Sequence, residues 1–317
     1  MPRHVSRVTI AMATACGITV FGLAVLPVNG QAGQTTTTAP AAQGRGRGTT
    51  PAAPATTAPA STYRAPRTPD GKPDLNGIWQ VNNDANWNIE PHMAQAALQM
   101  RPGPVIPVPA AAVLAMGAVG SVPPGIGILA DGDTIPYKPD KLAQRKKNQD
   151  TWAQSDPEVK CYLPGVPRAN YMPYPFQIFQ SASQFFIAYE YAGAVRNIYL
   201  KDPGPAPVDS WMGQSVGHWE GETFVVDAKG FNDSSWFDRA GNFHTEKLHV
   251  IERWTRTGPN ELLYEATIED PDTFTRPWKI RFPLFRRTDG RQIMDFKCVE
   301  FVEELLYGAY RKTPLPR

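Results

Sequence analysis

Three segments near the C-terminus alternate between apolar and polar residues, and this pattern constrains the fold more than any other feature. They are residues 248–256, 262–269 and 278–287. In the middle segment, Leu262, Tyr264 and Ile268 are spaced by even numbers, so they lie on one face of an extended chain. Gly258-Pro259-Asn260 and Asp289-Gly290 supply turn residues after the first and third segments. The pattern therefore predicts consecutive β-strands connected by tight turns.

Further strand-like segments extend this pattern over the second half of the chain. They are residues 176–181, 185–191, 196–200, a hairpin at 218–226, and 292–299. About nine strands would leave unpaired edges unless the sheet closes, so we predict a mostly β fold in which an antiparallel meander forms a barrel. Proline occurs 32 times, and its frequency between residues 80 and 138 predicts an irregular, Pro-rich N-terminal half. A few short helices belong there, the clearest at 140–152.

The first residues have the composition of a secretory signal. A basic start is followed by an uncharged segment at 8–26 and then by small residues. This order predicts a signal peptide at 1–32, cleaved after Gly30 or Ala32. Two alternatives stay open. The segment is long enough to remain as an uncleaved membrane anchor, and Cys16 would be the modified residue of a lipoprotein.

The next segment, 33–67, is rich in Thr, Ala and Pro. It cannot bury enough apolar surface to offset the entropy of ordering, so we predict a disordered linker and a single folded domain at 68–317. The signal indicates an extracytoplasmic location, periplasmic or secreted, without membrane contact beyond an uncleaved N-terminal anchor. Lys and Arg total 32 against 30 Asp and Glu, and this near balance gives no support for nucleic acid as a partner.

Two resemblances link the folded domain to known proteins. Residues Asn76-Gly77-Ile78-Trp79 resemble the Gly-x-Trp motif that opens the first strand of lipocalin-like barrels. In that superfamily the tryptophan closes one barrel end, often beneath an arginine of a late strand, which here implies Arg286 or Arg287. The segments that resemble a group of secreted bacterial proteins of unassigned function are 161–168, 171–178, 219–227, 244–254 and 267–278. These resemblances imply a lipocalin-like β-barrel outside the cytoplasm, but no reaction.

The cysteines fit the same compartment. The chain has three, and cleavage of the signal would leave Cys161 and Cys298. An even pair in an exported protein is most simply a disulfide. We predict that this disulfide ties the irregular first half to the last predicted strand. The alternative is a pair of buried free thiols.

The candidate site lies in the loop at 230–243 and the start of the strand that follows it. A histidine near carboxylates suits general acid–base catalysis near neutral pH, or a divalent metal, although the spacing fits no metalloenzyme motif and leaves the metal unknown. The candidate catalytic residues are His244, Glu246, Asp233 and Asp238, and the candidate ligand-binding residues are Trp236 and Asn232. Pairing with a carboxylate would raise the pKa of His244 above its usual value of about 6.5.

Two further patterns have catalytic precedents. Residues 213–217 spell Gly-x-Ser-x-Gly around Ser215, but no helix follows, as the nucleophile elbow of hydrolases requires. A Gly-rich turn is the simpler interpretation. Glu269, Asp270 and Asp272 form an acidic strand end. Paired carboxylates serve glycoside hydrolysis, but such residues are also common in turns.

Two classes of function fit these observations, and in both the partner is a small molecule. In the first, the barrel mouth binds a small apolar, aromatic or sugar-like ligand. In the second, the protein is a secreted hydrolase or lyase that uses its His, Asp and Glu side chains as an acid–base or metal site. We favour binding because no catalytic motif is complete. The sequence leaves open whether the protein is an enzyme and which cofactor it uses, although nucleotide-binding glycine loops are absent.

Overall fold

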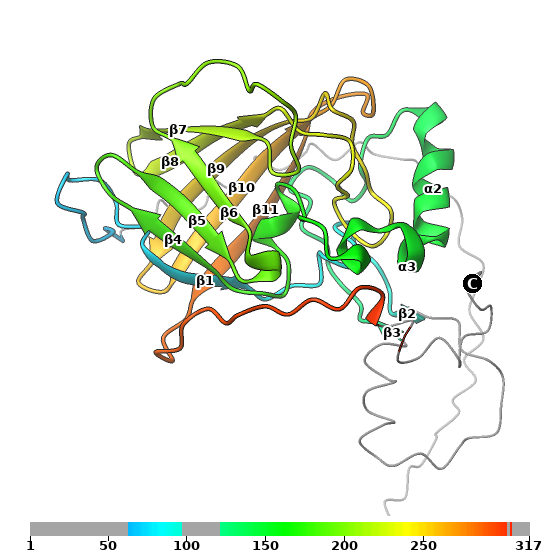
Figure 1. Ribbon diagram of the computed structural model, residues 1–317, viewed down its shortest axis with the longest axis horizontal. Helices are drawn as coiled ribbons and strands as arrows, with labels where there is room; N and C mark the ends of the chain where they lie inside the picture. The colour runs from blue at the N-terminus through cyan, green and yellow to red at the C-terminus, as the bar shows by residue number, and fades with distance from the viewer. Residues whose placement is uncertain (1–62, 97–120, 303–304, 306–317) are drawn as a thin grey trace, which may run out of the picture. The chain divides into compact units, whose positions relative to one another are not determined.

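The computed structural model describes residues 63–96, 121–302 and 305, and a closed β-barrel forms its core (Figure 1). Around the barrel the strands follow the order β1, β11, β10, β9, β8, β7, β6, β5, β4. Their bounds are β1 (Gly77–Val81), β4 (Phe176–Gln180), β5 (Phe185–Tyr189), β6 (Val195–Tyr199), β7 (Gln214–Glu220), β8 (Thr223–Lys229), β9 (His249–Gly258), β10 (Glu261–Glu269) and β11 (Trp278–Arg286). The predicted mostly β barrel is confirmed. The predicted signal peptide and most of the linker lie outside the described residues.

Nearly all neighbouring strands of the barrel are antiparallel, and β7 to β11 follow one another in chain order. The exception is the pair β6 and β7, which run parallel through two residue pairs, Ile198 with Ser215 and Tyr199 with Val216. This pair departs from the predicted antiparallel meander. The reason is that residues 200–213 leave the end of β6 and return beside Ile198, so β7 starts next to the end of β6 and runs in the same direction.

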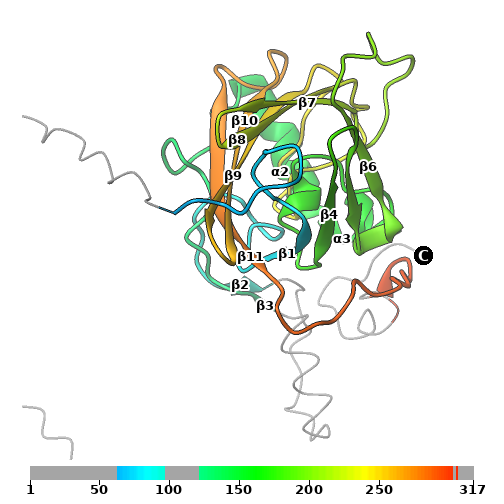
Figure 2. The ribbon, with the colours of Figure 1, turned by 90° about the vertical axis from the view of Figure 1, so that its left-hand side faces the viewer.

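Strand β1 closes the barrel between β11 and β4 (Figure 2). Within it, Trp79 pairs with Arg286 of β11 on one side and with Phe176 of β4 on the other. The predicted strand at 292–299 is wrong, since these described residues have no regular secondary structure. Both neighbours of β11, namely β10 and β1, are already in place, so no edge of the barrel is free for the segment that follows β11.

The remaining regular structure is short. The predicted helix at 140–152 is present as a 3₁₀ turn at Pro139–Lys141, helix α2 (Leu142–Asp150) and helix α3 (Trp152–Ser155). The other 3₁₀ turns of the described residues are Pro157–Lys160, Arg168–Asn170 and Tyr191–Gly193. A separate two-stranded sheet joins β2 (Gln95–Ala96) to β3 (Ser121–Val122).

Aromatic rings and a buried ion pair fill the barrel interior. The rings of Trp254 and Tyr264 pack edge-on with centroids 4.6 Å apart. Beside them, Arg196 of β6 pairs with Glu252 of β9, and both side chains are buried. Arg196 Nε also donates to Ser215 Oγ at 2.9 Å, and the Tyr264 hydroxyl donates to Glu252 at 2.8 Å. Within the described residues the interior is thus a packed core with a satisfied charge pair, as in small barrels whose lumen is filled by side chains.

Trp79 lies beneath two arginines in this barrel. Its side chain is fully buried, and its Nε1–H donates to the Leu75 carbonyl oxygen at 2.9 Å. The guanidinium carbons of Arg286 and Arg256 lie 5.8 and 6.0 Å from its ring centroid. Gly77 has φ +137°, and a Cβ there would lie 2.9 Å from Arg286 Nε, so this position accepts only glycine.

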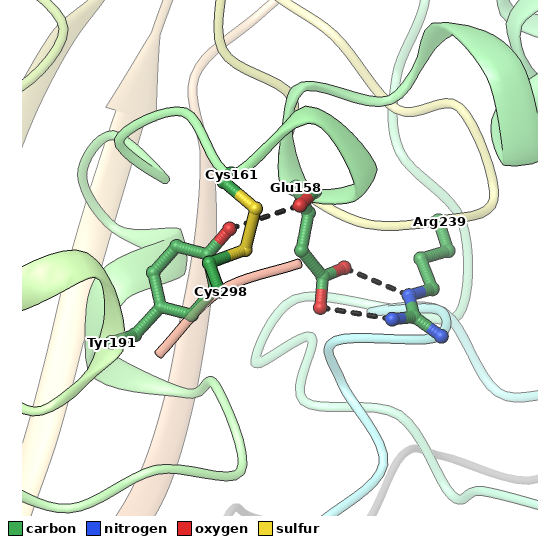
Figure 3. The surroundings of a disulfide bond; sticks show 5 residues. All are labelled: Glu158, Cys161, Tyr191, Arg239 and Cys298. Carbon is green, nitrogen blue, oxygen red and sulfur yellow. Dashed lines mark hydrogen bonds and ion pairs between the residues drawn. A yellow bond between two sulfur atoms is a disulfide. The ribbon is translucent and has the colours of Figure 1, made fainter. Parts of the chain in front are cut away.

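The predicted disulfide between Cys161 and Cys298 is present, with Cα atoms 5.8 Å apart (Figure 3). It holds a C-terminal strap, residues 291–302, against the 3₁₀ turn at Pro157–Lys160. Within that turn, Glu158 accepts hydrogen bonds from Arg239 at 2.8 and 2.9 Å, and its carbonyl oxygen accepts one from the Tyr191 hydroxyl at 3.0 Å. The cysteine of the strap therefore follows an irregular segment and not a strand.

Candidate functional site

His244, the centre of the predicted site, is buried and hydrogen-bonded on both ring nitrogens. Its Nδ1–H donates to the Thr245 carbonyl oxygen at 2.9 Å, because a carbonyl can only accept. Its Nε2 therefore accepts from the Ser235 hydroxyl at 2.8 Å. Burial lowers the pKa of His244 below its ordinary value. The predicted rise in this pKa is wrong, because the imidazole is desolvated and has no carboxylate as a hydrogen-bond partner.

None of the predicted carboxylates is hydrogen-bonded to this imidazole, although the charge of Asp233 acts to raise the pKa of His244 against the larger effect of burial. Asp233 is exposed, and Glu246 is exposed beside Lys247, with Oε1 4.0 Å from the ammonium nitrogen. Asp238 is fully buried and accepts hydrogen bonds from the backbone N–H of Ile89 at 2.9 Å and from the side chain of Asn242 at 2.6 Å. Burial raises the pKa of Asp238 to about 6. These side chains thus do not form a shared acid–base centre with His244.

The two predicted ligand-binding residues are half-buried parts of the same loop. Trp236 forms an isolated β-bridge with Phe243, and Asn232 Oδ1 accepts from the backbone N–H of Ser234 at 3.2 Å. Both residues therefore take part in the internal structure of the loop.

The hydrogen bond from Ser235 to His244 has the form of a nucleophile and its general base. Each of the two residues is 2% exposed. A Cβ at Gly165 would lie 2.3 Å from Ser235 Oγ, so the neighbouring chain packs directly on the hydroxyl. No space for a substrate remains beside this oxygen. Ser215, the serine of the Gly-x-Ser-x-Gly pattern, is fully buried in β7 and bonded to Arg196, so it too lacks access.

Two residues of the acidic strand end, Asp270 and Glu269, have different roles. Asp270 is buried and accepts from the backbone N–H of Thr245 at 2.7 Å and from the Thr273 hydroxyl at 2.8 Å, so it joins two loops. Glu269 belongs to a charged set that the sequence analysis missed. His249, on the outer face of β9, places Nδ1 3.0 Å from Glu269 and Nε2 2.8 Å from Asp227.

The set formed by Asp227, His249 and Glu269 joins three neighbouring strands on the outer face of the barrel. One carboxylate lies within hydrogen-bond distance of each ring nitrogen of His249. Partial burial acts to raise the pKa of Asp227, but the hydrogen bond from His249 holds it below its ordinary value. The alternation of β9 already places His249 on the face opposite Val250, which is the signal that could have revealed this set.

A cavity of about 390 Å³ lies at the outer edge of β11, and we call it the edge pocket. Strand β1 pairs with the end of β11, whereas residues 128–130 pair with its beginning, through Arg281 N–H to the Ile128 carbonyl and Ala130 N–H to the Lys279 carbonyl, each at 2.8 Å. The pocket opens between these two partners. Residues that line it include Asn83, Asp84, Asn88, His92, Arg281 and Pro283.

Two residues that line the edge pocket, His92 and Asn83, each have a buried side-chain nitrogen without a hydrogen-bond partner. His92 Nδ1–H donates to the Glu90 carbonyl oxygen at 2.8 Å, so Nε2 carries a free lone pair. Asn83 Oδ1 accepts from the backbone N–H of Ala85 at 3.0 Å, which leaves Nδ2 as an unused donor. Leaving such a group unpaired costs about 1–3 kcal/mol, so the arrangement favours any molecule that supplies the missing partners.

Other cavities of the described residues lack this property. One of about 620 Å³ lies beside β7 and β8, and one of about 450 Å³ lies at the end of β10. No unpartnered buried side-chain atom lines either of them. Among the described residues there is also no group of three or more His, Cys, Asp or Glu side chains placed to hold a metal ion.

Comparison with known proteins adds no assignment: no family model, curated protein or solved structure matches this chain. Within residues 63–96, 121–302 and 305, the helices are too short and too polar to cross a membrane.

Proposed function

We propose that this chain is an exported binding protein that holds a small molecule in the edge pocket. The observation that carries the proposal is that His92 and Asn83, which line a cavity of about 390 Å³, each keep a buried side-chain nitrogen, Nε2 and Nδ2, without a hydrogen-bond partner. Cavities of roughly 300–1,000 Å³ suit small ligands, and a few polar groups fix the ligand within them. The proposed pocket lies at the side of the barrel, whereas the sequence indicated its mouth.

Two other observations support this proposal. The barrel interior is occupied by the rings around Trp254 and by the pair of Arg196 with Glu252, so a ligand is better accommodated outside the lumen. Export is supported by the charged, apolar and small-residue order of the first 32 residues and by the disulfide, a bond that persists in oxidising compartments.

The alternative function, a hydrolase or lyase, has a single structural argument in its favour. This is the hydrogen bond between Ser235 and His244. Because both side chains are 2% exposed and the chain at Gly165 covers the hydroxyl, catalysis would require the loop to open. Binding without turnover therefore agrees better with the geometry.

Native mass spectrometry of the protein purified from its own host tests the proposal. We expect a mass adduct of one small molecule on the wild type and its loss in His92→Phe. His218→Phe is the matched control, because the His218 side chain is 59% exposed on β7, away from the pocket, and should retain the adduct. An adduct that survives His92→Phe, or no adduct together with no binding from a fragment library, would refute the proposal.

A further inference from the structure

We infer that the ligand of the edge pocket is a neutral molecule with several hydroxyl groups, such as a sugar or a cyclitol. This inference rests on the proposed function, because it names the ligand class of the same pocket. A hydroxyl group both donates and accepts a hydrogen bond, so it can pair with either kind of unpartnered atom.

The pocket presents donors and acceptors in mixture. His92 Nε2 can only accept and Asn83 Nδ2 can only donate. Asn88 adds a second amide, whose Oδ1 already accepts from the backbone N–H of Glu90 at 3.0 Å and whose nitrogen is the group left for a ligand. Asp84 adds carboxylate acceptors. An apolar or aromatic ligand would leave these groups without hydrogen-bond partners, and this disfavours such a ligand.

The formal charges of the lining cancel. Asp84 contributes its one carboxylate and Arg281 its one guanidinium. Arg281 also forms an ion pair with Glu265, whose Oε1 lies 3.6 Å from the Arg281 Nε. Neither an anion nor a cation finds a net opposite charge here, so the electrostatics favour a neutral ligand.

The apolar part of the lining is aliphatic. Pro124, Ile128 and Pro283 contribute to it. Phe282 also lines the pocket, but its side chain is 3% exposed and packs inward against Tyr264, with ring centroids 4.9 Å apart. The pocket therefore offers no phenyl face on which an aromatic ligand could stack, whereas the C–H faces of a sugar ring can lie against aliphatic surface.

The position of His92 is fixed by Gly125, with which it forms an isolated antiparallel β-bridge. An added Cβ at Gly125 would lie 2.5 Å from His92 Cε1, so the imidazole packs directly on this glycine. Gly125→Ala should therefore displace the acceptor without removing any polar group. This gives a second way to test the role of the imidazole.

Titration calorimetry with named probes tests the ligand class. The sugar probes are D-glucose, D-galactose, N-acetyl-D-glucosamine and myo-inositol, and the comparison probes are phenol, toluene, spermidine and glucose 6-phosphate. We expect at least one sugar probe to bind. His92→Phe and Gly125→Ala should each lower the affinity for that sugar about tenfold. Asn83→Asp keeps the Oδ1 acceptor for Ala85 but replaces the donor by a carboxylate oxygen. Asn83→Asp should likewise weaken the binding of a sugar, but it should strengthen the binding of a cation.

Proton NMR of the wild type gives a readout that does not depend on variant stability. Addition of the binding sugar should shift the His92 Cε1–H resonance and leave that of the exposed His218 unchanged. If phenol, toluene, spermidine or glucose 6-phosphate binds in a manner sensitive to His92→Phe while no sugar does, the ligand class is wrong and the proposed binding function stands. If no probe binds and native mass spectrometry shows no adduct, the proposed function itself fails.

Discussion

Removal of the disulfide by Cys161→Ser together with Cys298→Ser should destabilise the domain by several kcal/mol. The two cysteines are separated by 137 residues, and a loop of this length corresponds to about 5 kcal/mol in the chain-entropy model of the unfolded state. Measured effects are commonly smaller than this model gives, so we expect a loss of about 2–5 kcal/mol in the free energy of unfolding.

The folded structure should change little in this double variant, because other contacts also hold the C-terminal strap. The ring of Phe296 lies 4.9 Å from that of Tyr191, and the backbone N–H of Met294 donates to Glu190 at 2.8 Å. The effect should therefore fall on the unfolded chain, which expands when the cross-link is removed. A larger dependence of unfolding free energy on urea concentration should accompany the loss of stability.

Urea unfolding followed by tryptophan fluorescence measures both quantities. The comparison needs the oxidised wild type, the wild type with dithiothreitol, and the double serine variant. The last two should agree, because each lacks only the cross-link. A loss below about 1 kcal/mol with an unchanged urea dependence would refute the entropic argument.

Glu252→Ala leaves the buried Arg196 guanidinium without its carboxylate and should cost about 3–5 kcal/mol in urea unfolding; a loss below about 1 kcal/mol would contradict the buried pair. Burial raises the pKa of Asp238 to about 6, above its unfolded value of about 3.9, so its contribution to stability is present below about pH 4 and is lost as pH rises through 6. Asp238→Asn should flatten that part of the stability–pH curve, and an unaltered curve would count against the shift. Gly165→Ser strains the backbone, which has φ +74°, and also places a Cβ 2.3 Å from the Ser235 hydroxyl oxygen. Gly204→Ser is the control, because the backbone has φ +88° but nothing lies within 4 Å of the added Cβ. Thermal unfolding should show a larger loss for the first, and equal losses would refute the steric argument.

The sequence predicted those strands whose position is determined by residues close together in the chain. Leu262 and Ile268 fall on the inner face of β10 because alternation alone determines which side chains face a core. The disulfide was predicted from the two cysteines that would be left after cleavage of the predicted signal. The prediction of a strand at 292–299 was wrong because the apolar residue Phe296 packs against Tyr191 and Tyr174 from outside the barrel. No local sequence pattern encodes this contact.

The candidate site was harder to predict because a dense polar loop has the same composition whether its groups meet a ligand or one another. His244 and Asp238 are hydrogen-bonded to Ser235, Thr245 and Asn242 from the same stretch of chain, and Asp238 also accepts from the backbone N–H of the distant Ile89. The edge pocket is defined by the opposite condition, namely missing partners, which depend on distances across the fold. The available signal was the polar run that begins at Asn82 directly after the first strand.

The place of β1 between β11 and β4 has a consequence for the order in which the barrel folds. Trp79 of β1 pairs with Arg286 of β11, which lies far along the chain. Pairing over such a sequence distance is slow to form, so the barrel can close only after β11 has been synthesised. A nascent or shortened chain that ends before β11 leaves β1 without its second neighbour, and the ring of Trp79 then lacks the guanidinium of Arg286 that packs near it.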